Sequence, residues 1–122
     1  IDMGLVLDGY CSDMTRTVVL GQMDDLTRER FRLVRRAQLA GIAAAGFGPA
    51  FGHSLGHGVG LAVHEPPSLS RRYNRKLRPG MVVTVEPGIY LPEWGGIRLE
   101  NMVVVTESGC EVLNKDTTFL DV

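Results

Sequence analysis

Cysteine, long apolar runs and net charge are all scarce in this chain, and each scarcity excludes a class of protein. Its 122 residues include two cysteines, Cys11 and Cys110, which are too few for the framework of a disulfide-rich secreted domain. No apolar run approaches the ~20 residues that span a bilayer, and nothing resembles a secretory signal. We therefore expect a cytoplasmic protein with no membrane partner.

The net charge gives no indication of a polyanionic partner. The 13 Lys and Arg residues against 14 Asp and Glu residues leave a net charge of −1, so no nucleic-acid partner is expected. The hydrophobic share of 44% and the charged share of 22% are typical of one globular domain. One basic run is interpreted as a solvated connection. It consists of Arg71, Arg72, Arg75, Lys76 and Arg78.

The order of predicted elements is that of an α+β fold. Residues 1–7 and 10–20 predict two strands joined at the turn signal Asp8-Gly9. Further strands are predicted for 81–86, 89–91, 97–106 and 110–113, with interruptions at Pro66-Pro67 and at Trp94–Gly96. Because tight turns join most of these strands, we expect a mostly antiparallel sheet.

One helix is predicted between the first hairpin and the later strands. From Arg28 to Ala45, apolar residues such as Phe31 and Val34 recur at helical spacing, with arginines on the opposite face. Gly46 has the freedom to end the helix in a left-handed conformation. A helix of this length, about 27 Å, could cover one face of a sheet.

All three histidines, His53, His57 and His64, fall in one glycine-rich stretch from Phe51 to Pro67. Glycine has no Cβ, so the backbone there can approach a neighbouring group closely. A single histidine in an apolar strand is commonly a structural core residue. Three in one stretch, with carboxylates predicted on other strands, indicate a metal or proton-transfer site instead.

Four carboxylates occupy strand-like segments that otherwise suit a core: Asp2, Asp13, Glu86 and Glu100. A buried carboxylate is costly unless it is paired, protonated or coordinated to a metal. Arg98 could neutralise one of the four, whereas two divalent cations could neutralise them all. Oxygen ligands with one imidazole suit Mn²⁺, and they also permit Co²⁺ or Zn²⁺.

The predicted hairpins can bring these carboxylates to one place. Asp2 and Asp13 lie on opposite arms of the first hairpin, and Glu86 and Glu100 lie on neighbouring later strands. A pair of metals held ~3.5–4 Å apart by shared carboxylates can bridge a water and lower its pKa. The resulting hydroxide can attack a carbonyl, so such a site needs no serine or cysteine nucleophile.

Several motifs carry a family resemblance. They are Asp2-Met-Gly, Ser12-Asp-Met-Thr-Arg-Thr, His53-Ser-Leu-Gly-His-Gly-Val-Gly-Leu-Ala-Val-His-Glu-Pro-Pro, Thr84-Val-Glu-Pro-Gly-Ile-Tyr and Gly95-Gly-Ile-Arg-Leu-Glu-Asn. Through them the chain resembles the metallopeptidases of the pita-bread fold, in the branch of Xaa-Pro dipeptidases (prolidases) and X-Pro aminopeptidases. The resemblance implies a creatinase/aminopeptidase-like fold with a mostly antiparallel curved sheet and covering helices. It also implies hydrolysis of the peptide bond before proline, in a proline-containing peptide, by a metal-bridging hydroxide.

The same resemblance implies a ligand set for two divalent metal ions. Asp13 and Glu100 would bridge both ions. Asp2 would complete one site, and His57 with Glu86 would complete the other. Mn²⁺ is the expected metal, with Co²⁺ or Zn²⁺ as alternatives.

Three further residues would be catalytic by resemblance. His53 and His64 match histidines that hydrogen-bond substrate and stabilise the tetrahedral intermediate or move protons. Arg98 matches an arginine that is linked to substrate binding and orientation. Methionine aminopeptidases share the metal ligands but not the sequence motifs around Glu86 and Arg98, so they are the second choice. Creatinase-like relatives lack the full ligand set.

Two parts of the family pattern have no counterpart, so only part of the fold is expected. Residues 1–122 would be a C-terminal catalytic domain, from which the N-terminal half and a helical stretch near 46–51 are missing. Two rival interpretations are a non-catalytic pita-bread module that binds peptides or proteins, and a structural role for the acidic residues in ion pairs. Dipeptidase or aminopeptidase action is left open, as is a homodimer.

Overall fold

The computed structural model describes residues 1–43, 54–70, 72–73 and 75–115, without the side chains of 42 and 43. The predictions for His53, Ala45 and Gly46 lie outside the described residues.

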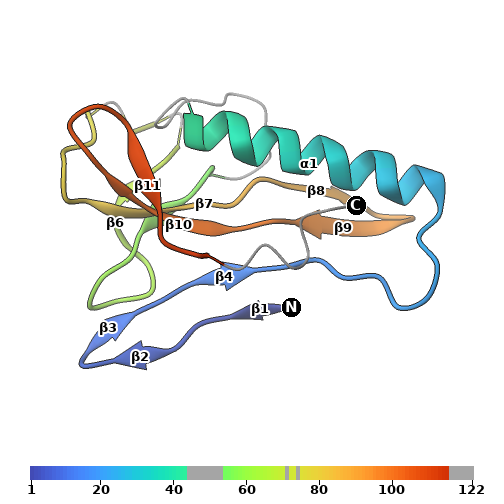
Figure 1. Cartoon of the computed structure of the whole chain (residues 1–122), viewed down its shortest axis with the longest axis horizontal. Helices are drawn as coiled ribbons and strands as arrows, with labels where there is room; N and C mark the ends of the chain where they lie inside the picture. The colour runs from blue at the N-terminus through green and yellow to red at the C-terminus, as the bar shows by residue number, and fades with distance from the viewer. Residues whose placement is uncertain (44–53, 71, 74, 116–122) are drawn as a thin grey trace.

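Within the described part, the chain forms one helix and a series of short antiparallel strands in layers (Figure 1). The helix α1 (Asp25–Ala43) lies along one side of the central strands, and the N-terminal hairpin lies on the opposite side.

The N-terminal hairpin consists of two short antiparallel ladders. They are β1 (Asp2–Met3) with β4 (Met14–Thr15), and β2 (Val6–Leu7) with β3 (Tyr10–Cys11). The predicted turn at Asp8-Gly9 is confirmed, since φ is 51° and 84° at its two residues, as a tight hairpin turn requires. The predicted return strand is too long, because it ends at Thr15 rather than near Leu20. The next threonine, Thr17, bonds through its side chain to the Arg98 backbone.

The helix is confirmed, with an earlier start than predicted. It begins at Asp25 because the side chain of Asp24 caps it, accepting a hydrogen bond of 2.6 Å from the Thr27 backbone N–H. Its inner face buries Phe31 and Val34, which are 2% and 1% exposed. Both pack against Ile97 and Leu99 in one hydrophobic cluster. Burial of this face holds α1 against the segment that carries Ile97 and Leu99.

The central sheet has five antiparallel strands in the order β11-β10-β7-β5-β6. They are β5 (His57–Gly58), β6 (Glu65–Ser68), β7 (Val82–Val85), β10 (Asn101–Val105) and β11 (Cys110–Val112). A separate hairpin is formed by β8 (Gly88–Leu91) and β9 (Gly95–Arg98). A second hydrophobic cluster of Leu55, Val83, Val85 and Val103 holds β5, β7 and β10 together. The α+β prediction with a mostly antiparallel sheet is therefore confirmed.

Two strand predictions are wrong because of tertiary contacts. The interruption expected at Pro66-Pro67 is part of β6, an edge strand, where a missing N–H need not break a ladder. The strand expected over 97–106 is divided into β9 and β10. Between them the Glu100 N–H donates to Thr15 O at 3.0 Å, and the chain then changes its strand partner from β8 to β7.

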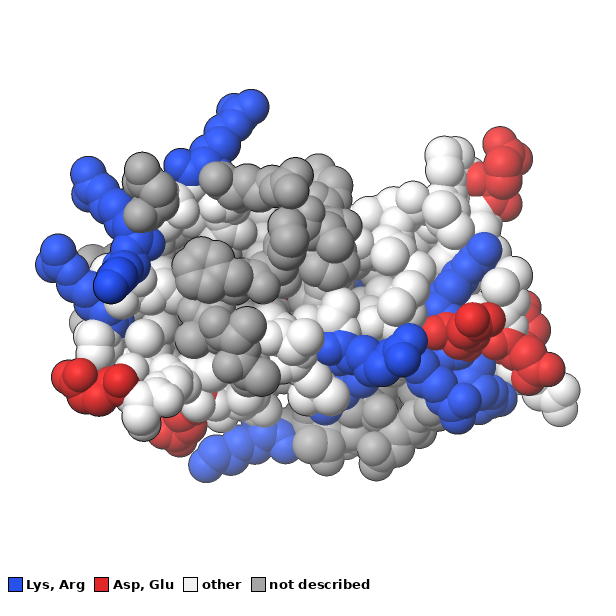
Figure 2. All heavy atoms as spheres, turned by 90° about the horizontal axis from the view of Figure 1, so that it is seen from above, with Lys and Arg blue, Asp and Glu red and all other residues white. Residues whose placement is uncertain are grey.

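The basic connection is solvent-exposed wherever it is described. Arg72, Arg75, Lys76 and Arg78 are all exposed, as predicted. Figure 2, which views the α1 side, shows Lys and Arg in separate groups, with Asp and Glu beside them where α1 begins. The one helix of the described chain is too short or too polar to cross a membrane.

Candidate metal centre

A cleft of about 400 Å³ opens between the N-terminal hairpin and the central sheet. All five side chains predicted as metal ligands line this cleft, together with His64 and Arg98. The remaining predicted site residue, His53, lies outside the described residues. The fold therefore gathers side chains from the hairpin, from β5, and from the segments after β7 and β9.

The acidic and imidazole side chains form overlapping groups of three. One group is Asp2, Asp13 and Glu100, and another is His57, Glu86 and Glu100. Within each group, one ligand atom from every residue lies within 4.8 Å of the other two. Both groups contain Glu100, so the five residues surround one continuous space. A third group joins Asp13 and His57 to His64.

His57 presents one ring nitrogen to the carboxylates. Its Nε2 lies 3.6 Å from Asp13 Oδ2 and 3.2 Å from Glu86 Oε1. Its Nδ1 lies 3.0 Å from Gly58 O, and a carbonyl can only accept, so Nδ1 carries the proton in that contact. The lone pair of a neutral imidazole is then on Nε2, facing two carboxylates. Only a cation or a proton between these groups makes that arrangement favourable.

Glycine beside His57 lets β5 approach β7 closely. A Cβ on Gly56 would lie 1.9 Å from Thr84 O, which no other residue could tolerate without displacement. The close approach allows the His57 backbone N–H to donate to Thr84 Oγ1 at 3.0 Å. The Gly-His-Gly sequence therefore fixes the imidazole at this position in the sheet.

Glu100 is the most deeply placed carboxylate of the cleft. It is 2% exposed, and burial, joined by the charges of Glu86, Asp13 and Asp2, raises its pKa to about 7. A hydrogen bond of 2.6 Å from Thr15 Oγ1 to its Oε2 acts in the opposite direction. Such a carboxyl is destabilised as an anion until positive charge is brought near it.

Arg98 lies at the edge of the carboxylate cluster. Its Nη2 forms an ion pair with Asp2, and its Nε donates to Thr15 Oγ1 at 3.3 Å. Its Nη1 lies 3.4 Å from the Tyr90 hydroxyl. One guanidinium offsets one charge of four, so the remaining carboxylates and the imidazole fit hard divalent cations.

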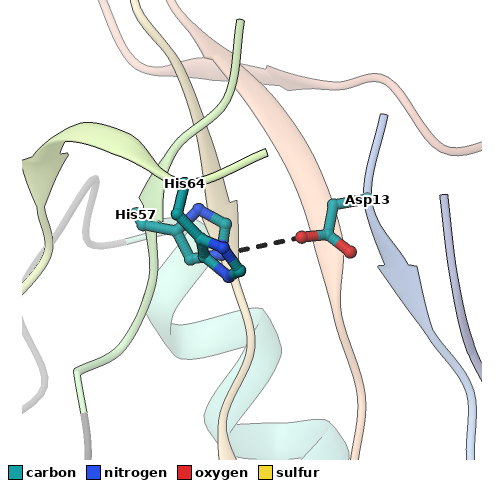
Figure 3. Close-up of side chains that lie close together, drawn as sticks. All are labelled: Asp13, His57 and His64. Atoms are coloured by element: carbon teal, nitrogen blue, oxygen red, sulfur yellow. Dashed lines mark ion pairs between the residues drawn. The ribbon is translucent and has the colours of Figure 1, made fainter. Parts of the chain in front are cut away.

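His64 lies beside His57 at the entrance to the cleft. The two ring centroids are 4.2 Å apart, and His64 is exposed whereas His57 is partly buried. Figure 3 shows both imidazoles on one side and the Asp13 carboxylate facing them from the other. This placement gives His64 access to a molecule in the cleft while leaving His57 among the carboxylates.

Several polar residues of the site were not assigned a role from the sequence. Thr15 and Thr84 contact site glutamates, and Tyr90 contacts Arg98. Arg16 is 2% exposed and donates to Glu100 O at 2.6 Å, behind the carboxylate. The sequence did contain an indication of the two threonines. Each lies two residues from a predicted metal ligand, so the threonine and the ligand are expected on the same face of the strand.

Comparison with known proteins identifies the fold of the chain. The prolidase from Pyrococcus furiosus, a pita-bread protein, superposes with a TM-score of 0.86 at 38% identity, over 94% of this chain and 40% of that chain. The X-Pro aminopeptidase from Thermotoga maritima superposes with a TM-score of 0.83 at 42% identity, over 92% of this chain and 38% of that chain. The chain belongs to metallopeptidase family M24, whose family model matches residues 1–48 and 42–107. The pita-bread fold expected from the motifs is therefore confirmed.

Two curated relatives are similar over most of the chain. An uncharacterized peptidase of Bacillus subtilis is 48% identical over 129 residues, covering 89% of this chain and 36% of the relative. An Xaa-Pro dipeptidase of Pyrococcus furiosus is 41% identical, covering 94% of this chain and 39% of the relative. The chain thus spans less than half the length of the relatives that it matches.

Proposed function

We propose that the chain is the metal-binding part of a peptidase that hydrolyses the peptide bond preceding proline. The observation that carries this proposal is the pair of three-residue groups that share Glu100 in one cleft. Membership of family M24 supports a metal-dependent peptidase. Similarity to an Xaa-Pro dipeptidase and to an X-Pro aminopeptidase supports a substrate with proline after the scissile bond.

The proposed ligands are Asp2, Asp13, His57, Glu86 and Glu100. Asp2 would belong to one ion, His57 and Glu86 to the other, and Asp13 and Glu100 to both. The grouping of Asp2 with Asp13 and Glu100, and of His57 with Glu86 and Glu100, supports this division. Because most donors are carboxylate oxygens with one imidazole, we propose Mn²⁺, with Co²⁺ or Zn²⁺ as alternatives.

When bound, two divalent cations would supply an activated water as nucleophile and polarise the scissile carbonyl. The residues of the chain would bind and orient the peptide around that chemistry. His64, exposed beside His57, is placed to hydrogen-bond the substrate carbonyl or to carry a proton to the leaving nitrogen. Arg98, anchored by Asp2 and Tyr90, is placed to orient the peptide. We propose a second catalytic imidazole at His53.

We further propose that residues 1–122 are part of a C-terminal pita-bread catalytic domain of a longer polypeptide. The chain covers 36% and 39% of its two relatives, which supports this. So does the exposure of apolar side chains on the N-terminal hairpin, which a neighbouring segment would cover. They are Ile1, Met3, Leu5, Val6, Leu7 and Tyr10.

Metal analysis together with peptide hydrolysis tests the proposed function. The complete gene product is stripped of metal, reloaded with Mn²⁺, and assayed on an Xaa-Pro dipeptide and an Xaa-Pro-Yaa tripeptide. We expect two ions per chain and hydrolysis that chelation removes and Mn²⁺ restores. Preference for the dipeptide would indicate a dipeptidase, and preference for the tripeptide would indicate an aminopeptidase. Bound metal without hydrolysis of either peptide would contradict the proposal and indicate a binding module.

A further inference from the structure

Two buried threonine hydroxyls reach the site glutamates from opposite sides of the cleft. Thr15 comes from β4 of the N-terminal hairpin and is 5% exposed. Thr84 comes from β7 of the central sheet and is 0% exposed. Each hydroxyl touches one of the two glutamates, Thr15 touching Glu100 and Thr84 touching Glu86.

The direction of the Thr84 hydrogen bond follows from its other partner. The His57 backbone N–H, which can only donate, lies 3.0 Å from Thr84 Oγ1. The hydroxyl oxygen is therefore an acceptor there, and its own proton is available to Glu86 Oε1 at 3.0 Å. In this way Thr84 links the backbone at His57 to the carboxylate of Glu86, across two strands.

The same pattern recurs at Thr15. Arg98 Nε, which can only donate, lies 3.3 Å from Thr15 Oγ1. The Thr15 hydroxyl proton is then directed to Glu100 Oε2 at 2.6 Å. Each threonine thus accepts one N–H and donates to one glutamate oxygen, and the position of each hydroxyl oxygen is set by the single, restricted χ1 torsion of a β-branched side chain.

We propose that Thr15 and Thr84 are positioning residues that hold the carboxylates of Glu100 and Glu86 in the orientation that binds metal. This inference rests on the proposed function. The terminal torsion of a glutamate is broad and roughly two-fold, so an unrestrained carboxylate samples many orientations. A directed hydrogen bond from a rigid, buried donor narrows that range before a cation arrives, as outer partners of metal ligands do in general.

Pairs of substitutions at each threonine distinguish the effect of the hydroxyl from the effect of side-chain shape. Thr15→Val and Thr84→Val keep the branched shape and remove the hydroxyl, whereas Thr15→Ser and Thr84→Ser keep the hydroxyl. The matched control is Thr17→Val, because the Thr17 hydroxyl lies on the same arm but bonds to the Arg98 backbone at 3.1 Å and 2.9 Å rather than to a carboxylate. All are made in the complete gene product.

The readouts are Mn²⁺ affinity by calorimetry and the visible absorption of the Co²⁺-loaded protein. We expect each valine variant to bind Mn²⁺ about 10- to 100-fold more weakly, and each serine variant to stay within about threefold of wild type. The Co²⁺ spectrum should change in the valine variants and be restored in the serine variants. The Thr17→Val variant should resemble wild type in both measurements.

Valine variants that bind Mn²⁺ as tightly as wild type would overturn the positioning role while leaving the peptidase proposal intact. Wild-type protein that binds none of Mn²⁺, Co²⁺ or Zn²⁺ would overturn both. If a valine variant fails to fold, serine and alanine at the same position replace it, since they differ only in the hydroxyl. Equal Mn²⁺ affinity in that pair would likewise overturn the inference.

Discussion

His57 Nε2 lies 3.2 Å from Glu86 Oε1, although His57 is in β5 and Glu86 directly follows β7. The contact depends on the close approach of β5 to β7 and on the hydroxyl of Thr84 between them. An imidazole nitrogen held against a carboxylate in this way is stabilised by a cation that both can bind. The predictions that follow concern how this arrangement holds metal, supports catalysis and affects stability.

Replacement of the proposed ligand Glu100 should abolish metal binding without destabilising the fold. We expect Glu100→Gln to lower kcat/KM with an Xaa-Pro dipeptide by at least about 10³-fold. In the metal-free protein the same change removes a buried negative charge beside three others, so Tm should be unchanged or higher. Added Mn²⁺ should raise the Tm of wild type and leave that of the variant unchanged. Thermal unfolding of wild type and variant, each with and without Mn²⁺, measures these Tm values.

The matched control for that prediction is Glu107→Gln, because Glu107 is exposed in a turn away from the cleft. It should keep both turnover and the rise of Tm with Mn²⁺. Wild-type turnover in Glu100→Gln would rule out Glu100 as a metal ligand.

Replacement of His64 should affect turnover more than metal content. His64 contacts His57 but is exposed at the cleft entrance, so His64→Ala is expected to reduce kcat by about 10²- to 10⁴-fold. Metal occupancy, measured by elemental analysis of the loaded protein, should stay near that of wild type. A His64→Ala protein that no longer holds metal would instead make His64 a ligand, together with Asp13 and His57.

Gly56 should be intolerant of any side chain. A Cβ there would lie 1.9 Å from Thr84 O, so Gly56→Ala must separate β5 from β7 and displace His57. We expect a loss of about 1–3 kcal/mol in the free energy of unfolding, measured by denaturant titration, and weaker Mn²⁺ binding. Gly109→Ala is the control, because its Cβ would meet nothing within 4 Å. Equal stability of the two variants would contradict the close packing at Gly56.

The pKa of Glu100 predicts the pH dependence of the metal-free protein. Burial and neighbouring carboxylates raise this pKa from its ordinary value of 4.5 to about 7. Between those values the folded protein holds a proton that the unfolded chain has released, so Glu100 makes stability fall as pH rises from about 4.5 to about 7. The Glu100→Gln variant should show a smaller fall. Tm measured across this range in the presence of a chelator tests the prediction, and parallel curves would refute it.

Local sequence was sufficient for much of the fold. The Asp8-Gly9 turn depends on two adjacent residues that tolerate positive φ, and the helix depends on a repeat of apolar residues with a capping aspartate at its start. The convergence of Asp2 with Asp13 follows from their positions on the two arms of one hairpin. These features are readable because the forces that produce them act between residues close in the chain.

Long-range contacts decided what the residue pattern could not. Only the order of strands in the folded sheet makes Pro66-Pro67 part of an edge strand, and only contact with Thr15 divides the strand at Glu100. The hydrogen bond from Thr15 to Glu100 joins residues 85 positions apart. Residue types and alternation therefore indicated which side chains could meet, whereas close packing between distant strands determined their partners, their burial and the raised pKa of Glu100.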